Sequence, residues 1–214
     1  RHMLEELIEY AQTGRRVVLV GCSFQGYGMV SVDSDNFFGA SLAVKHLADI
    51  GHTKIGFVGG QPHDTNTVDR QRGFRAAISG RGLEHRPEWS IVSEGPMDDY
   101  DSRDKDRIAE ILRSDDRPTA VFAGGSFVAM SVISVANSIG LRVPHDLSIV
   151  GYDDPPFIQH MNPPLTTIRQ PLNDMAKKAA ELVVSPFLFG DISREQYLFD
   201  PELVIRESTF PIHT

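Results

Sequence analysis

Short apolar runs alternate with longer amphipathic segments along most of this chain. A few consecutive apolar residues bounded by glycine or proline are typical of a strand that is buried on both faces of a sheet. The predicted strands are Val17–Val20, Val30–Val32, Ile55–Val58, Ile91–Val92, Ala120–Phe122, Ser148–Val150, Thr166–Ile168 and Leu203–Arg206. The predicted helices are Leu4–Gln12, Phe38–Ile50, Val68–Gly80, Ser102–Ser114, Val128–Ile139 and Leu172–Leu188. Strands that alternate with helices in this way predict an α/β fold with parallel sheets flanked by helices.

Composition narrows the classes of function. The 214 residues are enough for one large domain or two smaller lobes, and 41% hydrophobic with 23% charged residues is ordinary for a globular protein. A net charge of −8 argues against nucleic-acid binding by this chain itself. Cys22 is the single cysteine, so an intramolecular disulfide is excluded, and no Cys/His spacing predicts a metal site. No apolar run is long enough for a membrane span and no secretory leader is visible, so we expect a cytoplasmic protein.

Glycine-rich turns follow two of the predicted strands, at Gly21–Gly28 and Gly56–Gly60. Neither has the spacing of a dinucleotide-binding or phosphate-binding loop, so no cofactor is predicted. The segment around Ser126 is not a hydrolase nucleophile elbow, because Val128 stands where that motif needs glycine. The sequence therefore does not favour an enzyme.

The segment Leu141–Pro171 carries the strongest chemical signal. Pro144 forces a turn after a helix, a short buried strand follows, and Asp153 and Asp154 come directly after that strand. In open α/β sheets, ligands bind beyond the carboxyl ends of the strands. A carboxylate there can accept hydrogen bonds from a neutral polyol or an amine, whereas it would repel a phosphate.

This segment also carries a family resemblance. The motif L-x-V-P-x-D-L-S-I-V-G-Y-D-D, followed by P-x-L-T-T-I-x-Q-P, resembles the effector-binding core of the LacI/GalR family of bacterial transcription regulators. The resemblance continues in Ser31–Gly60, Asp69–Ile78 and Arg117–Met130, and it covers about Val17 to Thr209. The order and spacing of these motifs together are specific, although no single one is decisive.

The resemblance implies a two-lobe fold like that of type I periplasmic binding proteins, in which the chain crosses three times between the lobes and the ligand lies between them. Residues 3–33 and 169–192 would form the N-terminal lobe, and residues 34–168 and 193–214 the C-terminal lobe. Family members begin this core with a strand-helix-strand unit preceded by a DNA-binding head. This sequence departs from that pattern, so the N-terminal lobe is expected to be incomplete.

The resemblance also implies ligand-binding roles for individual residues. Asp153 and Arg70 match the acid and the arginine that contact the effector, although an aspartate in a turn or an exposed helix arginine would explain them without a ligand. Asn66 matches a polar loop position, or is only a turn former. The remaining candidates are Met97 at a position that stacks on the effector, Gly125 and Ser126 where relatives carry a polar pair, and Gln170 at a crossing between the lobes.

Apolar residues on a helix and a nearby loop point to a homodimer. By family precedent this helix and loop form the dimer face, and exposed apolar clusters usually mark a partner. The alternative is that these side chains cover the core. The candidates are Val128, Val132, Val135, Phe157, Ile158 and Met161.

The function implied is that of an effector-sensing domain of a bacterial transcription regulator, most plainly a repressor, which binds a small sugar-like or nucleoside-like molecule. DNA would be bound only through a head domain that is absent from this chain. The alternatives are a sugar-binding receptor of a transporter and a small-molecule enzyme. The sequence upstream of Met3 in the gene would distinguish the first two classes, and turnover assays would test the third.

Overall fold

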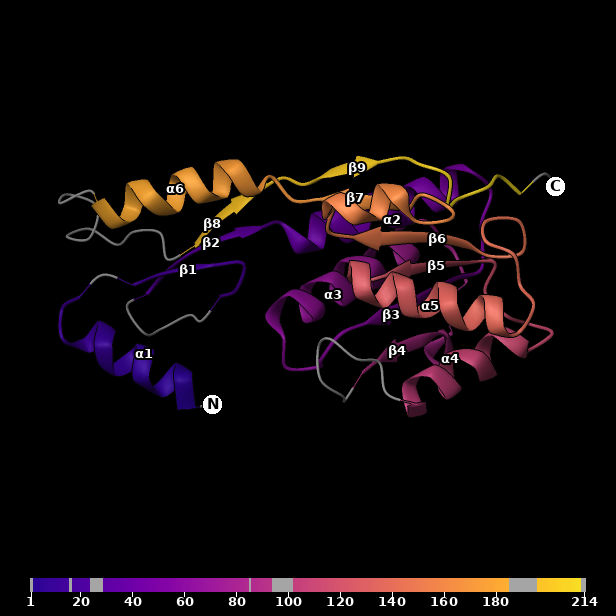
Figure 1. Cartoon of the computed structure of the whole chain (residues 1–214), viewed down its shortest axis with the longest axis horizontal. Helices are drawn as coiled ribbons and strands as arrows, with labels where there is room; N and C mark the ends of the chain where they lie inside the picture. Colours follow the sequence, from indigo (N-terminus) through magenta and orange to yellow (C-terminus); the bar gives the residue numbers. More distant parts are fainter. Residues whose placement is uncertain are drawn as a thin grey trace. The chain divides into compact units, whose positions relative to one another are not determined.

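The computed structural model of this chain divides into two compact units (Figure 1). Unit 1 combines Arg1–Asp35 with Gln170–Asp200, and unit 2 combines Asn36–Arg169 with Pro201–Thr214. The chain therefore passes three times from one unit to the other. The structure describes residues 2–15, 17–23, 29–84, 86–93, 102–184 and 196–212.

Unit 2 is built on a six-stranded sheet with the strand order β4-β3-β5-β6-β7-β9. All neighbouring strands are parallel except β7 and β9, which are antiparallel. The strands are β3 (Ile55–Gly59), β4 (Ser90–Val92), β5 (Ala120–Ala123), β6 (Ser148–Tyr152), β7 (Thr166–Arg169) and β9 (Glu202–Val204). The helices are α2 (Asn36–Asp49), α3 (Thr65–Gly80), α4 (Ser102–Arg113) and α5 (Ser126–Ser138), with short 3-10 turns η1 (Pro87–Trp89) and η2 (Pro156–His160). The predicted α/β fold with parallel sheets is confirmed.

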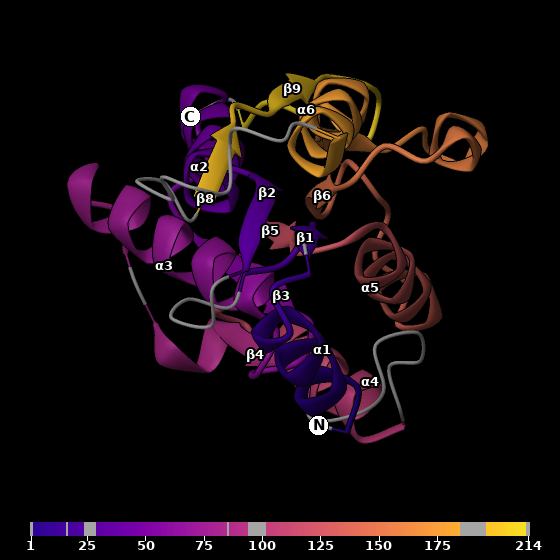
Figure 2. The same cartoon turned by 90° about the vertical axis from the view of Figure 1, so that its left-hand side faces the viewer.

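The sheet of unit 2 separates two hydrophobic cores. Successive side chains of a strand point to opposite faces, so Phe122 of β5 packs with α2 and α3, while its neighbour Val121 packs with α4 and α5. Figure 2 shows these two helix pairs on opposite sides of β3 and β5. Full burial of one such side chain contributes about 1.5–3 kcal/mol, which explains why the central strand β5 is apolar throughout.

Close packing between α2 and α3 depends on one glycine. A Cβ atom added to Gly73 of α3 would overlap the backbone carbonyl of Phe37 in α2. The two helices can approach closely only because this position carries no side chain. This contact matters for the site, because Arg70 lies one turn before Gly73 on the same helix.

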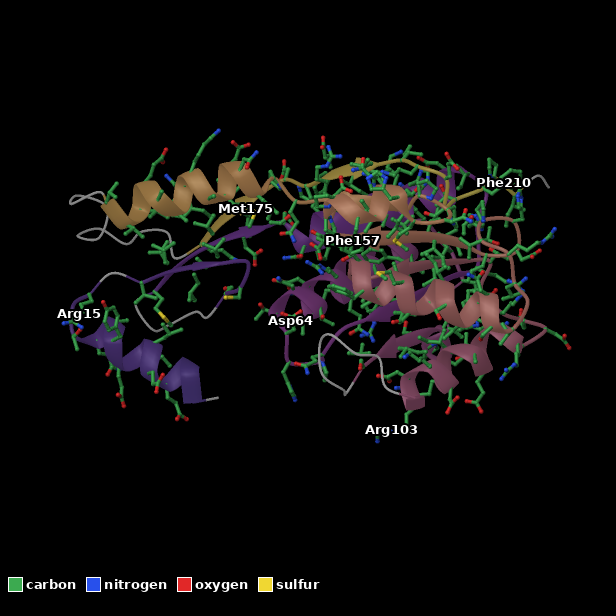
Figure 3. The ribbon with its side chains drawn as sticks, in the orientation of Figure 1. Arg15, Asp64, Arg103, Phe157, Met175 and Phe210 are labelled. Carbon is green, nitrogen blue, oxygen red and sulfur yellow. The ribbon has the colours of Figure 1, made fainter. Side chains whose placement is uncertain are left out.

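Unit 1 contains a smaller parallel sheet with the order β1-β2-β8. Its elements are α1 (His2–Gln12), β1 (Val18–Val20), β2 (Val30–Ser34), α6 (Leu172–Val184) and β8 (Gln196–Phe199). Met175, labelled in Figure 3, lies on the face of α6 that packs against Val30 and Val32 of β2. Residues of α1 pack instead with Leu19 of β1, so the sheet is covered by one helix on each face.

Strand β8 was not predicted, and it changes the last boundary between the two units. It pairs in parallel with Ser31–Ser34 of β2 and therefore belongs to unit 1. Residues 193–214 were expected to lie in the C-terminal lobe, but the last passage of the chain falls after Asp200. The hydrophobic pattern misses this strand because its side chains are only partly buried, so it lacks the apolar run of a central strand.

Helices α1, α2, α3 and α5 each begin two or three residues earlier than predicted, and for α3 and α5 the difference affects candidate site residues. The side chain of Asp64 accepts hydrogen bonds from the backbone N–H groups of Asn66 and Thr67, so α3 starts at Thr65 and Asn66 lies in its first turn instead of a loop. Helix α5 starts at Ser126, directly after the glycine pair that follows β5. None of the described helices combines the length and apolar character needed to cross a bilayer.

Two histidines hold the C-terminal segment of unit 2. His46 lies in the last turn of α2, and His52 lies three residues beyond the end of this helix. His46 shares a hydrogen bond with the hydroxyl of Thr209 at 3.0 Å, and His52 Nε2 lies 3.2 Å from the carbonyl oxygen of Phe210. The other ring nitrogen of His52 lies 2.9 Å from the hydroxyl of Thr119. Burial lowers the pKa of His52 from 6.5 to about 4, and burial also lowers the pKa of His46.

We predict that acidification destabilises unit 2 through His52. Because the pKa in the folded state lies below the value of 6.5 for a free side chain, the unfolded chain binds the proton first. The free energy of unfolding should therefore fall as the pH drops from about 6.5 towards about 4. Urea unfolding at pH 7 and pH 5 should show a smaller difference for His52→Gln than for the parent chain. The exposed His63→Gln is the matched control and should behave like the parent; equal pH dependence in all three chains would contradict the prediction.

Candidate functional site

The centre of the candidate site is Arg70, which is 5% exposed on helix α3. Its Nε donates to Oδ1 of Asn36 at 2.8 Å, and its Nη1 donates to the carbonyl oxygen of Gly124 at 2.6 Å. The guanidinium carbon lies 3.6 Å from the ring centroid of Tyr152, so the planar group stacks on the aromatic face. Residues from α2, α3, β6 and the β5–α5 turn therefore fix one side chain.

Asn36 connects two of the predicted ligand-binding residues. While its Oδ1 accepts from Arg70, its Nδ2 donates to Oδ1 of Asn66 at 3.2 Å. Asn36 is the first residue of α2 and is 4% exposed. Asn66 and Arg70 are four residues apart on α3, which places them on the same face of that helix.

Arg70 is unusual because it is buried without an acidic partner. Among the described residues no carboxylate forms an ion pair with it, and its hydrogen-bond partners are an amide and a backbone carbonyl. Its Nη2 has no hydrogen-bond partner within the same part of the chain. An Arg fork with a vacant donor suits a ligand oxygen, since a guanidinium presents its donors in fixed directions.

Gly125 and Ser126 lie at the amino end of α5, next to the carbonyl that Arg70 binds. Gly125 is the N-cap residue, without a side chain to cap the helix, and Ser126 is the buried first residue. Helix amino ends leave backbone N–H groups available to an acceptor. The structure therefore brings Asn66, Arg70 and the Gly124–Ser126 turn together, as predicted for the carboxyl ends of β3 and β5.

Asp153 follows β6 and has a strained backbone. Its φ of 71° is in the left-handed region, where it is the only described residue other than glycine. Its N–H donates to the carbonyl oxygen of Ile168 at 2.9 Å, and its own carbonyl accepts from Oγ1 of Thr167 at 2.7 Å. Non-glycine residues in this region are concentrated at functional sites. Asp153 is half-buried and follows Tyr152, the residue on which Arg70 stacks.

The neighbouring Asp154 has a different environment. Its two oxygens pair with Arg169 at 2.6 Å and with Arg206 at 2.7 Å, and its side chain is 8% exposed. The two aspartates after β6 thus have different surroundings. Asp154 is held in ion pairs, whereas Asp153 has a strained backbone at the strand end. The pKa of Arg169 is raised by its hydrogen bond to Asp154.

The two remaining candidates are Gln170, which belongs to unit 1, and Met97. Gln170 is the first residue of the second segment of unit 1, and its carbonyl accepts from the N–H of Leu172 at 2.9 Å. Met97 lies outside the described residues. Sequence reasoning missed Asn36 and Tyr152, which make the direct contacts to Arg70. The only signal was their position at the ends of a predicted helix and strand.

Four of the six predicted dimer residues are not on the surface. Val128, Val132, Val135 and Ile158 are buried in the core between the sheet and helices α4 and α5, and Met161 packs against that core. Their apolar character is explained by the fold of unit 2 itself. The exposed apolar side chains of this region belong to Phe127, Met130 and Phe157, at 54%, 39% and 40% exposure.

Phe127 of α5 and Phe157 of η2 form an exposed aromatic pair. Their ring centroids are 6.0 Å apart with an interplanar angle of 41°. Phe157 is labelled in Figure 3. Within the described part of the chain, no group of three or more His, Cys, Asp or Glu side chains is placed to hold a metal ion.

Comparison with known proteins gives consistent results. Residues 44–209 match the model of a periplasmic binding protein-like domain. The chain is 37% identical over 171 residues to the HTH-type transcriptional repressor PurR of Aliivibrio salmonicida, covering 79% of this chain and 50% of that protein. The chain spans about half the length of the curated relatives it matches.

Two solved structures show the same fold along almost the whole chain. A LacI family transcriptional regulator from Enterococcus faecium with bound ribose aligns with a TM-score of 0.78 and 26% identity, covering 95% of this chain and 74% of that one. A regulatory protein of the LacI family from Chloroflexus aggregans aligns with a TM-score of 0.80 and 26% identity, covering 94% and 70%. The resemblance to a LacI/GalR effector-binding core is confirmed.

We predict that replacements at Asp153 separate the backbone strain from the carboxylate. Asp153→Gly and Asp153→Ala both remove the side-chain charge, but only glycine adopts a φ of 71° without a Cβ penalty. The glycine variant should therefore be more stable than the alanine variant by about 1 kcal/mol, the cost of a left-handed residue with a Cβ atom. Urea unfolding of the two variants measures this difference, and equal stabilities would show that the backbone at Asp153 is not strained.

Proposed function

Because the chain belongs to the periplasmic binding protein-like domain family, we propose that it is the effector-binding part of a LacI/GalR-type transcription regulator. The relatives that cover most of this chain are named as transcriptional repressors, which favours a repressor over an activator. Effector binding would change DNA affinity only as far as the effector binds one conformation of the regulator better than another.

The observation that supports this proposal is the buried, uncompensated Arg70 at the carboxyl ends of the unit 2 strands. Tyr152, Asn36 and the carbonyl of Gly124 orient the guanidinium, and no described carboxylate neutralises it. Burying a charge without an ionic partner costs free energy, so a purely structural role for it is unfavourable. A ligand-binding role accounts for this arrangement.

The proposed ligand is a small polyol or a similar molecule with several hydroxyl groups. Arg70 supplies a donor, and Asp153, which follows the strand that carries Tyr152, supplies an acceptor for a hydroxyl or amine. A sugar or a nucleoside has both kinds of group. The similar regulator from Enterococcus faecium contains ribose, which makes D-ribose the first compound to test.

DNA binding is proposed to reside in another part of the regulator. The net charge of −8 does not suit the polyanionic backbone of DNA, and the curated relatives are about twice as long as the matched segment. A regulator of this kind acts in the cytoplasm and carries out no reaction on its effector. A transporter receptor shares the fold but is not favoured, because the matched relatives are named as regulators.

We also propose that the protein forms a homodimer through the exposed end of α5. Phe127, Met130 and Phe157 lie together on the side of unit 2 that faces away from α2 and α3, as judged from the core that α5 and η2 share. Aromatic and methionine side chains are enriched in protein interfaces. This surface replaces the buried valines of the sequence-based prediction.

Ligand screening tests the proposed site. Thermal unfolding of the parent chain should shift upward with D-ribose, another pentose, a hexose or a nucleoside, since a ligand at about 100 times its Kd stabilises the folded state by about 2.7 kcal/mol. Arg70→Met and Asp153→Asn should lose most of that shift. The matched control is Arg72→Met on the same helix, where an exposed arginine pairs with Asp69, and it should keep the shift. Full shifts in both site variants would place the ligand elsewhere.

A turnover assay with the same compounds distinguishes a regulator from an enzyme. The proposal expects each sugar or nucleoside to be recovered unchanged after incubation with the protein. Conversion of any compound that also shifts thermal unfolding would favour the enzyme alternative.

Sedimentation velocity tests the proposed dimer. The parent chain should sediment as a dimer, and Phe127→Glu should sediment as a monomer because it places a charge in the centre of the apolar patch. Phe38→Glu on α2 is the matched control, since Phe38 is 39% exposed and lies on the other side of the sheet. Loss of the dimer in the control, or its persistence in Phe127→Glu, would reject this surface.

A further inference from the structure

The carboxylate of Asp154 is held on both sides by arginines, Arg169 at the end of β7 and Arg206 in the segment after β9. Arg206 Nη2 donates to Oδ1 at 2.7 Å, while Arg169 Nε donates to Oδ2 at 2.7 Å. The Asp154 side chain is 8% exposed and the Arg206 side chain 16% exposed, so this pair is mostly buried, whereas the Arg169 side chain is 46% exposed. Hydrogen bonds between charged groups in such surroundings are strong and directional.

Each arginine is itself fixed by a second contact. Nη1 of Arg206 donates to the carbonyl oxygen of Leu165 at 2.7 Å, and its backbone N–H donates to Oγ1 of Thr166 at 2.9 Å. Nη1 of Arg169 pairs with Oε1 of Glu202 at 2.8 Å. These contacts join the end of β6 to both β7 and β9. We refer to Asp154, Arg169 and Arg206 as the arginine clamp.

The arginine clamp adjoins the strained residue Asp153. Strand β7 holds the backbone of Asp153 through the carbonyl of Ile168 and the hydroxyl of Thr167. The side chain of the next residue, Asp154, is fixed by the two arginines. A left-handed conformation is unfavourable for a residue with a Cβ atom and persists only where the surroundings determine it. The arginine clamp and β7 together hold Asp153 in this left-handed conformation.

We propose that Asp154, Arg169 and Arg206 are positioning residues for the effector, which act by fixing the direction of the Asp153 carboxylate. This inference rests on the proposed function, in which Asp153 accepts hydrogen bonds from the ligand. Binding groups must be held within a fraction of an ångström to be effective, and their supporting residues set that precision. None of the three clamp residues needs to touch the ligand.

Because of its position, the role of the arginine clamp can be tested separately from the general stabilising effect of an ion pair. Arg142 and Asp146 form another ion pair with two hydrogen bonds, 2.7 and 2.9 Å long, in the turn before β6. That pair precedes the same strand but lies at its amino end, whereas the clamp lies at the carboxyl end next to Asp153. Arg142→Met is therefore a matched control for the loss of an arginine from an ion pair.

The first measurement needs no ligand. Amide hydrogen exchange, followed by NMR, reports on the Asp153 N–H, which is hydrogen-bonded to Ile168 in the native state. In Arg206→Met the exchange of this amide should accelerate by about tenfold or more relative to the amides of β3 and β5, because the turn loses its support on one side. Arg142→Met should leave it unchanged. Unchanged exchange in Arg206→Met would overturn the proposal.

The second measurement is D-ribose affinity by isothermal titration calorimetry. Arg206→Met should weaken binding by about tenfold, by analogy with the lower end of the loss seen when the hydrogen-bond partners of metal ligands are removed. Arg206→Lys, which keeps the charge but not the fork, should recover part of the loss. Arg142→Met should bind like the parent. If Arg206→Met disturbs folding, Arg169→Gln serves instead, because Arg169 is 46% exposed and its loss should cost about threefold in affinity.

The outcomes distinguish the two proposals. If Asp153→Asn binds D-ribose as well as the parent, the proposed function of Asp153 fails, and the positioning role for the ligand fails with it. If Asp153→Asn weakens binding while Arg206→Met and Arg169→Gln do not, only the positioning role is overturned. If the parent does not bind D-ribose, Asp153 has no role towards this sugar, and the amide exchange of Arg206→Met alone decides whether the clamp fixes the Asp153 turn.

Discussion

The parallel pairing of β3, β5, β6 and β7 is the constraint on which the candidate site depends. Parallel strands end at the same edge of a sheet, so the residues that follow them are brought together whatever their distance in the sequence. This is how Gly124 after β5 and Asp153 after β6 come to lie at the same edge of the sheet. The hydrogen bonds of the sheet are uniform, but the groups placed at its carboxyl edge are all different.

The burial of Arg70 shows how closely the residues at the carboxyl edge of the sheet pack around one side chain. The guanidinium contacts an aromatic face, an amide and a carbonyl, none of which carries a charge, and the residue is 5% exposed. Such a group is less costly than a buried ammonium, because its charge is delocalised and weakly hydrated. Its retention still requires that the neighbouring elements be rigid, which the close contact at Gly73 between α2 and α3 helps to provide.

Much of the fold followed from the sequence, because central strands and amphipathic helices have clear hydrophobic periods. The elements that escaped prediction are those with weaker signals: β8 is half-exposed, and the start of α3 is set by a side-chain cap from Asp64. For the site, the position directly after a strand indicated Asp153, whereas Arg70 was indicated by the family resemblance. The orienting partner Asn36 could not be identified, since its contact joins residues 34 positions apart. Of the candidate dimer residues, Val128, Val132, Val135 and Ile158 cover the core, which was the alternative interpretation, because one face of α5 packs against the sheet.

The sheet of unit 2 divides that unit into two packing compartments, one with α2 and α3 and the other with α4 and α5. The side chains that orient the guanidinium come from α2 and from Tyr152, whose ring belongs to the first compartment, whereas the exposed aromatic pair is anchored in the second. Core substitutions in one compartment can accumulate with little strain on the other. The proposed subunit interface and the proposed ligand site therefore draw on different helices of a single unit.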